Sequence, residues 1–335
     1  MNIVVLDGFT LNPGDLSWAE LEKLGNLKVY DRTEANLTVE RSKDAEIVIT
    51  NKTVITESLI SQLPNLKYVG VLSTGYNVVD TLAAAKNGIV VTNVPAYSTD
   101  SVAQITFSLL LELVINVGVH DKSVHKGEWE NSDDFSYSKT PLIELQGLTF
   151  GIIGFGRIGR TVAKIANAFG MNVLANNRSE IKEIPDYVTV ADKSEIFNNC
   201  DVVSLHVPLT NENSEFVNAK ILSMMKSSAY IINTGRGGLI NEQDLADALN
   251  NGKIAGAGLD VLSTEPPLAD NPLLNAKNCI ITPHIAWATI AARKRLMKIA
   301  VENVKAYIDG NQQNVVSWKP LAIFNILIPK SINWK

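Results

Sequence analysis

The sequence predicts an α/β fold of two doubly wound parallel-sheet domains. Short apolar runs rich in Val and Ile alternate with longer segments of helical period, which is the pattern of parallel sheets covered by helices. The runs fall into two successive series, each long enough for a core of its own. The chain of 335 residues also exceeds what one core usually organises, so two domains are expected.

Each series supplies its own set of strands. The strand candidates of the first series are Ile3–Leu6, Leu27–Tyr30, Ile47–Ile49, Tyr68–Leu72 and Ile89–Thr92, with helical stretches such as Leu16–Leu24 and Thr81–Lys86 between most of them. Those of the second series are Thr149–Ile153, Asn172–Ala175, Val202–His206, Tyr230–Asn233, Gly258–Val261 and Cys279–Thr282. Strands that are separated by helices pair in parallel, because a crossover is needed to return the chain to the same edge.

Two further helices lie outside the strand series. Ser101–Val117 is apolar enough to suggest a membrane segment, but it holds polar and acidic residues, so we expect a buried helix at a domain or subunit boundary. The segment that follows, His120–Pro141, is polar and aromatic and is expected to form an extended arm. The last helix candidate, Ile290–Ile308, is amphipathic and ends at Asp309-Gly310, an ordinary helix stop.

Composition excludes several classes of function. The formal net charge is −5 and no long run of Lys or Arg occurs, so neither nucleic acid nor a membrane surface is an expected partner. The two cysteines, Cys200 and Cys279, lie in or beside apolar runs, so we expect reduced, buried thiols in a cytoplasmic protein rather than disulfides or a metal site. No signal peptide is expected, because Met1–Asp7 resembles a strand. No apolar window reaches the roughly 18 residues of a membrane span.

The clearest motif is a glycine-rich turn. The run T-F-G-I-I-G-F-G-R-I-G-R starts at Thr149 and leads an apolar strand into Gly154, Gly156 and Gly159, after which a helical period continues. The first glycine permits a tight turn, the second lets backbone approach a pyrophosphate, and the third lets helix and strand pack closely. Such a motif alone is weak, but its place between a strand and a helix predicts a dinucleotide site.

The end of the next strand bears on the choice of dinucleotide. An acidic residue about 20 residues past the glycines would hold the ribose hydroxyls of NAD. Here the strand ends in A-N-N-R-S, so Asn177 and Arg178 occupy the expected place and no carboxylate is present. Because a guanidinium pairs well with a phosphate, NADP(H) is favoured over NAD(H). The alternative is that Arg178 is a solvated loop residue and Asn177 binds the ribose of NAD.

Only four histidines are available for acid–base chemistry. His120 and His125 lie in the polar arm and are expected to be exposed. His206 and His284 each end a strand, and residues at the carboxyl ends of parallel strands face the ligand crevice.

Strand ends of the second series supply a cation, a carboxylate and an imidazole: Arg236, Glu265 and His284. Hydride transfer to a keto acid needs a cation that holds the substrate carboxylate and an acid that protonates the nascent alkoxide. Histidine suits the acid, since it exchanges protons near neutral pH, and a neighbouring carboxylate would orient its ring. On the residues alone, each of the three also has an ordinary structural interpretation.

At these residues the chain resembles the D-isomer-specific 2-hydroxyacid dehydrogenases, and most of all their glycerate dehydrogenase or hydroxypyruvate reductase branch. The resemblance covers about residues 1–316. The matching segments, in order, are L-S-T-G-Y-N-V-V-D (72–80), N-V-P-A-Y-S-T-D-S-V-A-Q (93–104), G-F-G-R-I-G (154–159), H-V-P-L-T (206–210), N-T-G-R-G (233–237), G-L-D-V-L-S-T-E-P-P (258–267) and T-P-H-I-A-W-A-T (282–289).

The resemblance implies a role for each matching residue. Arg236 would bind the substrate carboxylate and the C2 oxygen, His284 would be the acid–base, and Glu265 its partner. The substrate carboxylate would also meet the backbone of Ser73, Thr74 and Gly75, with Tyr97 nearby. The implied cofactor contacts are Gly154, Gly156, Arg157, Ile158 and Gly159 at the pyrophosphate, Val207, Pro208 and Asn213 on the adenosine side, and Thr234, Gly235 and Asp260 toward the nicotinamide.

The resemblance also implies a domain plan. A flavodoxin-like substrate domain would comprise residues 1–98 and 286–335, and a Rossmann cofactor domain residues 99–285. Within the latter, the helix and arm at 100–147 would form a homodimer contact. The implied reaction interconverts a small 2-keto acid and its D-2-hydroxy acid, hydroxypyruvate and D-glycerate first, then glyoxylate and glycolate. The tail Ser317–Lys335 extends past the resemblance and has no functional interpretation.

Two alternatives remain open on sequence grounds. A nucleotide-sensing binding protein, similar to the transcriptional corepressors that resemble this family, would keep the site and use it to control partner contacts. Such a protein is expected to have a long polar tail, which this chain lacks. Among the enzymes, phosphoglycerate and formate dehydrogenases are the alternatives, and the former often has an extra regulatory domain.

Overall fold

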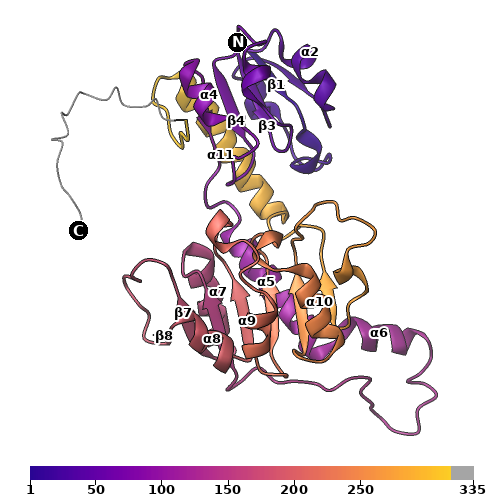
Figure 1. Cartoon of the computed structure of the whole chain (residues 1–335). Coiled ribbons are helices and arrows are strands. Elements are labelled where there is room, and N and C mark those ends of the chain that lie inside the picture. The colour runs from indigo at the N-terminus through magenta and orange to yellow at the C-terminus, as the bar shows by residue number, and fades with distance from the viewer. Residues whose placement is uncertain (318–335) are drawn as a thin grey trace, which may run out of the picture. The chain divides into compact units, whose positions relative to one another are not determined.

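The computed structural model describes residues 1–317 and divides the chain into two compact units. Unit 1 is Met1–Tyr97 with Ile290–Lys335, and unit 2 is Ser98–Thr289. Each unit is built on one sheet in which every strand pair is parallel (Figure 1). The predicted α/β fold with two doubly wound sheets is therefore confirmed.

The sheet of unit 1 has the strand order β2-β1-β3-β4-β5, which is the flavodoxin-like order. Its strands are β1 (Asn2–Val5), β2 (Asn26–Val29), β3 (Ile47–Thr50), β4 (Tyr68–Val71) and β5 (Val90–Thr92). All residues of β3 and β4 are buried, because helices cover both faces of a parallel sheet. This explains why both strands consist of continuous apolar runs instead of alternating ones.

The helices of unit 1 are short except for the last. They are α1 (Ala19–Glu22), α2 (Thr38–Ser42), α3 (Glu57–Ile60), α4 (Thr81–Lys86) and α11 (Ile290–Ile308), with 3-10 turns η1 (Gly8–Thr10) and η2 (Ala35–Leu37). The helix expected over Leu16–Leu24 begins later than predicted. The side chain of Asn12 accepts the Leu16 N–H and donates to its carbonyl, which holds this stretch out of the helix.

Helix α11 belongs to unit 1 although it is far from β4 in the sequence. Its Tyr307 ring lies 4.8 Å, centroid to centroid, from the ring of Tyr68 in β4. The chain then returns to the edge strand β5, where the hydroxyl of Ser317 accepts the Val91 N–H. The rest of the tail noted above lies outside the described residues.

The sheet of unit 2 has the order β12-β11-β10-β9-β6-β7-β8, a Rossmann arrangement whose order reverses between β9 and β6. Its strands are β6 (Thr149–Ile153), β7 (Asn172–Asn176), β8 (Val188–Val190), β9 (Val202–Leu205), β10 (Tyr230–Asn233), β11 (Gly256–Leu259) and β12 (Cys279–Ile281). Strand β8 was not predicted. It is a short edge strand with two of its three residues exposed, so its sequence has no continuous apolar run.

The helices of unit 2 cover both faces of this sheet. They are α5 (Thr99–Ile115), α6 (Val117–His125), α7 (Arg157–Ala168), α8 (Lys193–Asn199), α9 (Ala219–Met224) and α10 (Glu242–Asn250), with 3-10 turns η3 (Asn211–Asn213), η4 (Gly237–Leu239) and η5 (Pro272–Asn275). Helix α5 packs on α7, β10 and β11. Gly258 makes this approach possible, since a Cβ there would lie 2.9 Å from that of Leu109.

Two expectations about the segment after α5 are wrong. The helix breaks at Asn116, which has a left-handed backbone (φ 53°, ψ 47°), and the arm expected over His120–Pro141 starts inside helix α6. His120 is half-buried rather than exposed, because its ring nitrogens contact the Asn116 carbonyl and the Lys139 N–H. His125 is exposed. Among the described residues no single helix is long and apolar enough to cross a membrane, and α5 with α6 meets that criterion only as a pair bent by 58°.

Candidate active site

The sequence-predicted site residues of unit 2 gather at one edge of its sheet. They follow the carboxyl ends of β6, β7, β9, β10, β11 and β12. All strands run in parallel, so these exits share one edge. The reversal of strand order between β9 and β6 is where open α/β sheets bind their ligands.

The glycine-rich turn lies at this reversal and fits a dinucleotide. Gly154 has φ +102°, and a Cβ there would lie 2.5 Å from the carbonyl oxygen of His206, so only glycine is accommodated. A Cβ on Gly159 would lie 2.2 Å from the Gly154 carbonyl oxygen. Around Gly156 no atom lies within 4 Å of the Cβ position. The turn is therefore tight on its inner side and open at the residue that a pyrophosphate would approach.

Helix α7 begins directly after this open glycine. Its N-cap is Gly156, which has no side chain to accept the first N–H groups of the helix. Arg157 is exposed and Ile158 half-buried in the first turn. Free N–H groups and the helix dipole favour a phosphate at this position.

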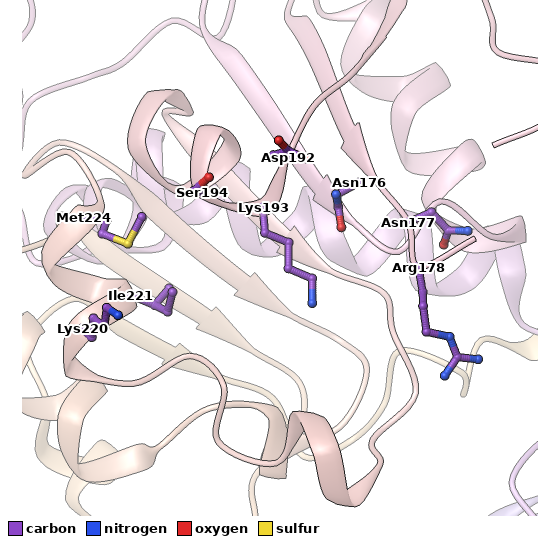
Figure 2. Close-up of a pocket in the computed structure, with 9 residues that line it drawn as sticks. All are labelled: Asn176, Asn177, Arg178, Asp192, Lys193, Ser194, Lys220, Ile221 and Met224. Carbon is purple, nitrogen blue, oxygen red and sulfur yellow. The ribbon is translucent and has the colours of Figure 1, made fainter. Parts of the chain in front are cut away.

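The exit of β7 is tied to the glycine-rich turn through Asn177. Its Oδ1 accepts the N–H of Phe155 (3.3 Å), and its Nδ2 donates to the carbonyl and hydroxyl of Ser179 (3.1 and 3.0 Å). Arg178 is exposed, and no ion pair to its guanidinium exists within residues 1–317. Both residues line a pocket between β7, α8 and α9 (Figure 2).

The loop after β9 is internally bonded. Asn213 accepts the Thr210 N–H through Oδ1 (2.7 Å) and donates to the Pro208 carbonyl through Nδ2 (2.8 Å). Val207 lies against Gly154. His206 bonds the Ser204 hydroxyl (2.9 Å), and burial lowers the pKa of its imidazole to about 4, which keeps it neutral near pH 7.

The turn after β10 presents Arg236. The buried side chain of Asn233 accepts the Gly235 N–H (3.0 Å) and donates to the Arg236 carbonyl (2.9 Å), so it braces this turn. The Arg236 guanidinium is exposed and donates one bond to the Gly235 carbonyl (2.7 Å). Thr234 is buried, with its hydroxyl 3.4 Å from that of Thr106 in α5. Within residues 1–317 the other guanidinium donors have no partner, so they are available to a ligand.

The exits of β11 and β12 bring Glu265 and His284 together. The Nδ1 atom of His284 lies 2.6 Å from Oε2 of Glu265, while Oε1 of the carboxylate accepts the Leu262 N–H (3.1 Å). The two side chains are 30% and 36% exposed. A carboxylate at Nδ1 holds the proton there and leaves Nε2 as the nitrogen that can exchange a proton with a ligand. His284 also has a positive φ of 53°, which is uncommon for a non-glycine residue.

Asp260 holds the segment that carries His284. Its Oδ1 accepts the Thr282 hydroxyl (2.6 Å) and the Ile285 N–H (2.9 Å), and its Oδ2 accepts the Ala286 N–H (2.8 Å). Its carbonyl accepts the N–H of His284 itself (2.8 Å). The side chain is fully buried, and this desolvation raises the pKa of the carboxyl group although the three bonds oppose the shift.

The predicted substrate residues of unit 1 follow β4 and β5. The Ser73 hydroxyl donates to the Gly75 carbonyl (2.5 Å), and the Thr74 hydroxyl donates to the Val94 carbonyl (3.0 Å). These bonds close a compact turn at the carboxyl edge of the unit 1 sheet. Tyr97 is 6% exposed, and its carbonyl accepts the Nε–H of Arg295 in α11 (2.8 Å).

Three residues of this edge were missed from the sequence. Asn233 could have been found from the sequence, since a polar residue at the last position of a buried strand is a signal of a site residue. Glu242 had none. It accepts the N–H and hydroxyl of Ser263 from 21 residues away and so supports the loop that holds Glu265. Lys193 lines the pocket beside Arg178.

A dinucleotide turn with a histidine–carboxylate pair on the same sheet edge is characteristic of nicotinamide-dependent dehydrogenases. Comparison with known proteins shows which family of these dehydrogenases the chain resembles. The family model for the D-isomer specific 2-hydroxyacid dehydrogenase, NAD binding domain, matches residues 107–286. The chain belongs to the D-isomer specific 2-hydroxyacid dehydrogenase family, so it is an oxidoreductase that uses a nicotinamide cofactor. The resemblance inferred from the sequence is confirmed.

Individual relatives are similar over most of the chain. A hydroxypyruvate reductase of Blautia hydrogenotrophica is 51% identical over 324 residues, which is 95% of this chain and all of that protein. A glycerate dehydrogenase of Methylorubrum extorquens is 41% identical over 280 residues, covering 83% of this chain and 87% of that protein. Among solved structures, an acyclic imino acid reductase in complex with NADPH and D-Arg has a TM-score of 0.82 at 33% identity, covering 94% of this chain and all of that one.

Proposed function

We propose that this enzyme interconverts hydroxypyruvate and D-glycerate, with glyoxylate and glycolate as its second substrate pair. The observation that carries the choice of substrate is the 51% identity to a hydroxypyruvate reductase over the whole length of that protein. The chemistry is supported by the His284–Glu265 pair at the ligand edge. When bound, the reduced nicotinamide supplies the hydride that C2 of the keto acid receives.

The chain's own residues would bind the acid and move one proton. Nε2 of His284 gives a proton to the alkoxide oxygen during reduction and takes it back during oxidation, while Glu265 holds the ring. The Arg236 guanidinium binds the substrate carboxylate and the C2 oxygen, where it stabilises the developing negative charge. The backbone of Ser73–Gly75, with Tyr97 nearby, is assigned to the substrate carboxylate.

Thirteen residues would hold the cofactor. The turn residues Gly154, Gly156 and Gly159, with Arg157 and Ile158, are assigned to the pyrophosphate, because the turn is open at Gly156 and α7 starts there uncapped. The remaining assignments are Asn177, Arg178, Val207, Pro208 and Asn213 toward the adenosine, and Thr234, Gly235 and Asp260 toward the nicotinamide. For Asp260 we add a positioning role, since both its carboxylate oxygens already bond the segment around His284.

The same proposal includes a preference for NADPH over NADH. A carboxylate at the end of β7 would bind both ribose hydroxyls and repel a 2′-phosphate. Asn177 removes this repulsion, and the guanidinium of Arg178, which forms no ion pair within residues 1–317, offers donors for the phosphate.

We further propose a homodimer that works in the cytoplasm. Helix α6 and the segment after it extend away from the sheet of unit 2 (Figure 1). This arm exposes large apolar side chains, Phe135 by 91% and Trp129 by 52%. Exposed apolar surface of this kind favours burial against another chain. Cys200 and Cys279 are free thiols, which suits a reducing compartment.

Initial rates with NADH and NADPH test the reaction directly. Hydroxypyruvate, glyoxylate, pyruvate and phosphohydroxypyruvate would be compared as substrates for reduction, and formate with NAD⁺ for oxidation. We expect the highest kcat/KM with hydroxypyruvate. A higher value with phosphohydroxypyruvate or formate would favour a phosphoglycerate or formate dehydrogenase. Cofactor binding without turnover of any acid would favour the nucleotide-sensing alternative.

A further inference from the structure

Besides Arg178, the pocket of Figure 2 is lined by two cations that the sequence motifs did not indicate, Lys193 and Lys220, and Lys193 is the one that follows the strand next to β7. The pocket lining includes Asn176, Asn177 and Arg178 from the exit of β7 and Lys193 from the exit of β8. Lys193 lies 15 positions after Arg178 in the sequence, and strand pairing brings the two exits together. Lys193 can therefore affect which ligand binds at the end of β7.

The register of the two strands sets both cations at the same level. Ala175 of β7 pairs with Val190 of β8. Arg178 and Lys193 each come three residues after that pair. The exits are fastened to each other, since Ala191 N–H donates to the Ala175 carbonyl (3.0 Å) and Asn176 Nδ2 donates to the Ala191 carbonyl (2.9 Å).

The charge of Lys193 is free for a ligand. Within residues 1–317 neither Lys193 nor Arg178 forms an ion pair. The Lys193 ammonium lies over the ring of Phe216, 5.3 Å from its centroid, a contact that orders the side chain without neutralising it. In Figure 2 the chains of Lys193 and Arg178 extend to the same side, while Asp192 points the opposite way.

From this geometry we infer that Lys193 is a cofactor-specificity residue which, together with Arg178, binds the 2′-phosphate of NADP(H). The inference rests on the proposed NADPH preference and adds a second determinant to it. The adenosine ribose of a dinucleotide reaches the end of the second strand of the sheet, here β7, and Asn177 ties that end to the glycine-rich turn. A phosphate at the 2′ position would lie beside both exits and meet two cations that form no ion pair in the described part of the chain.

Binding of nucleotide fragments tests Lys193 without any catalytic step. Adenosine 2′,5′-bisphosphate and 5′-AMP would be titrated calorimetrically into wild type, Lys193→Gln and Lys253→Gln. Lys253 is a matched control, because it is an exposed lysine of the same unit that precedes β11 at the opposite edge of the sheet. We expect Lys193→Gln to weaken the bisphosphate about tenfold, as for one charge-assisted hydrogen bond, and to leave 5′-AMP unchanged. The control should bind both as wild type does.

The outcomes separate this inference from the proposed reaction. A Lys193→Gln protein that retains wild-type affinity for the bisphosphate would overturn the role of Lys193, even if the NADPH preference is real. Equal binding of both nucleotides by wild type would overturn the role of Lys193 and also the proposed preference for NADPH. Because the assay contains no keto acid, a lack of hydroxypyruvate turnover would refute only the proposed reaction.

Discussion

Nδ1 of His284 lies 2.6 Å from Oε2 of Glu265, although the two residues are 19 positions apart in the sequence. The contact arises because their loops leave the neighbouring strands β12 and β11 at the same edge. A carboxylate at Nδ1 favours the proton on that nitrogen and leaves Nε2 for proton exchange. The pair is thus the structural basis for the proton transfer that we propose.

Replacing His284 should strongly slow the chemical step while cofactor binding persists. General acid–base residues contribute roughly 10²–10⁴-fold to rate, so His284→Ala should lose turnover on that scale. Because the residue has a positive φ, His284→Asn serves as the control, since asparagine tolerates this backbone better than alanine. Near-normal kcat in both variants, measured at saturating cofactor, would remove His284 from the mechanism.

Arg236→Lys should impair kcat/KM with hydroxypyruvate by roughly 10–100-fold. Lysine keeps the charge but loses the planar fork that binds a carboxylate through two bonds, each worth about 1.5–3 kcal/mol. NADH affinity, measured by fluorescence titration, should stay at the wild-type value because the change concerns the substrate. The anchor role would be excluded by an unchanged kcat/KM.

The cofactor preference should respond to Asn177→Asp. A carboxylate at this strand end accepts hydrogen bonds from the ribose hydroxyls and repels the 2′-phosphate. We expect kcat/KM with NADPH to exceed that with NADH by roughly tenfold in wild type, the effect of one charge-assisted bond, and the ratio to fall sharply in the variant. A wild-type preference for NADH that the new carboxylate does not alter would show that this strand end does not select the cofactor.

Asp260 should affect kcat through the position of His284. In Asp260→Asn only one oxygen remains to accept three hydrogen bonds, and an unsatisfied buried donor costs about 1–3 kcal/mol. We expect kcat to fall at least tenfold on that scale, with little change in KM, and Thr282→Val, which removes one bond, to fall less. Loss of thermal stability with full kcat below the unfolding temperature would mean that Asp260 is only structural.

His206 should make the stability of the protein depend on pH. Burial lowers the pKa of its imidazole from 6.5 to about 4, so the unfolded chain takes up this proton at a higher pH than the folded protein does. His206 therefore contributes fully to the free energy of unfolding above pH 6.5. This contribution is lost as the pH falls toward 4, by at most about 1.4 kcal/mol per pH unit.

His206→Gln isolates that contribution, because glutamine can still bond Ser204 but does not titrate. We expect urea unfolding at pH 7.5, 6 and 5 to show that the free energy of unfolding of wild type falls relative to that of the variant as the pH falls. A difference that is the same at all three values would contradict the assigned burial effect.

Most of the fold could be predicted because it depends on local patterns. Eleven of the twelve strands were expected at their places from short stretches of apolar residues, and Gly154 and Gly159 have the close contacts that the glycine motif predicts. Strand β8 and the helix break at Asn116 escaped prediction. Strand β8 forms because it pairs with β7, and the helix breaks because Asn116 has a left-handed backbone inside an otherwise helical pattern.

The sequence by itself determined the family and the dinucleotide turn, and it predicted Arg236, Glu265 and His284 as the catalytic residues, because the motifs that carry the resemblance depend on residue type and on position next to a strand. Only the tertiary structure decided how the side chains pair. The hydrogen bonds of the Asp260 carboxylate to the segment around His284 join residues more than 20 positions apart. The alignment of Lys193 with Arg178 follows from the register of β7 and β8. Contacts of this kind come from strand pairing across the sheet, and a residue pattern along the chain does not contain them.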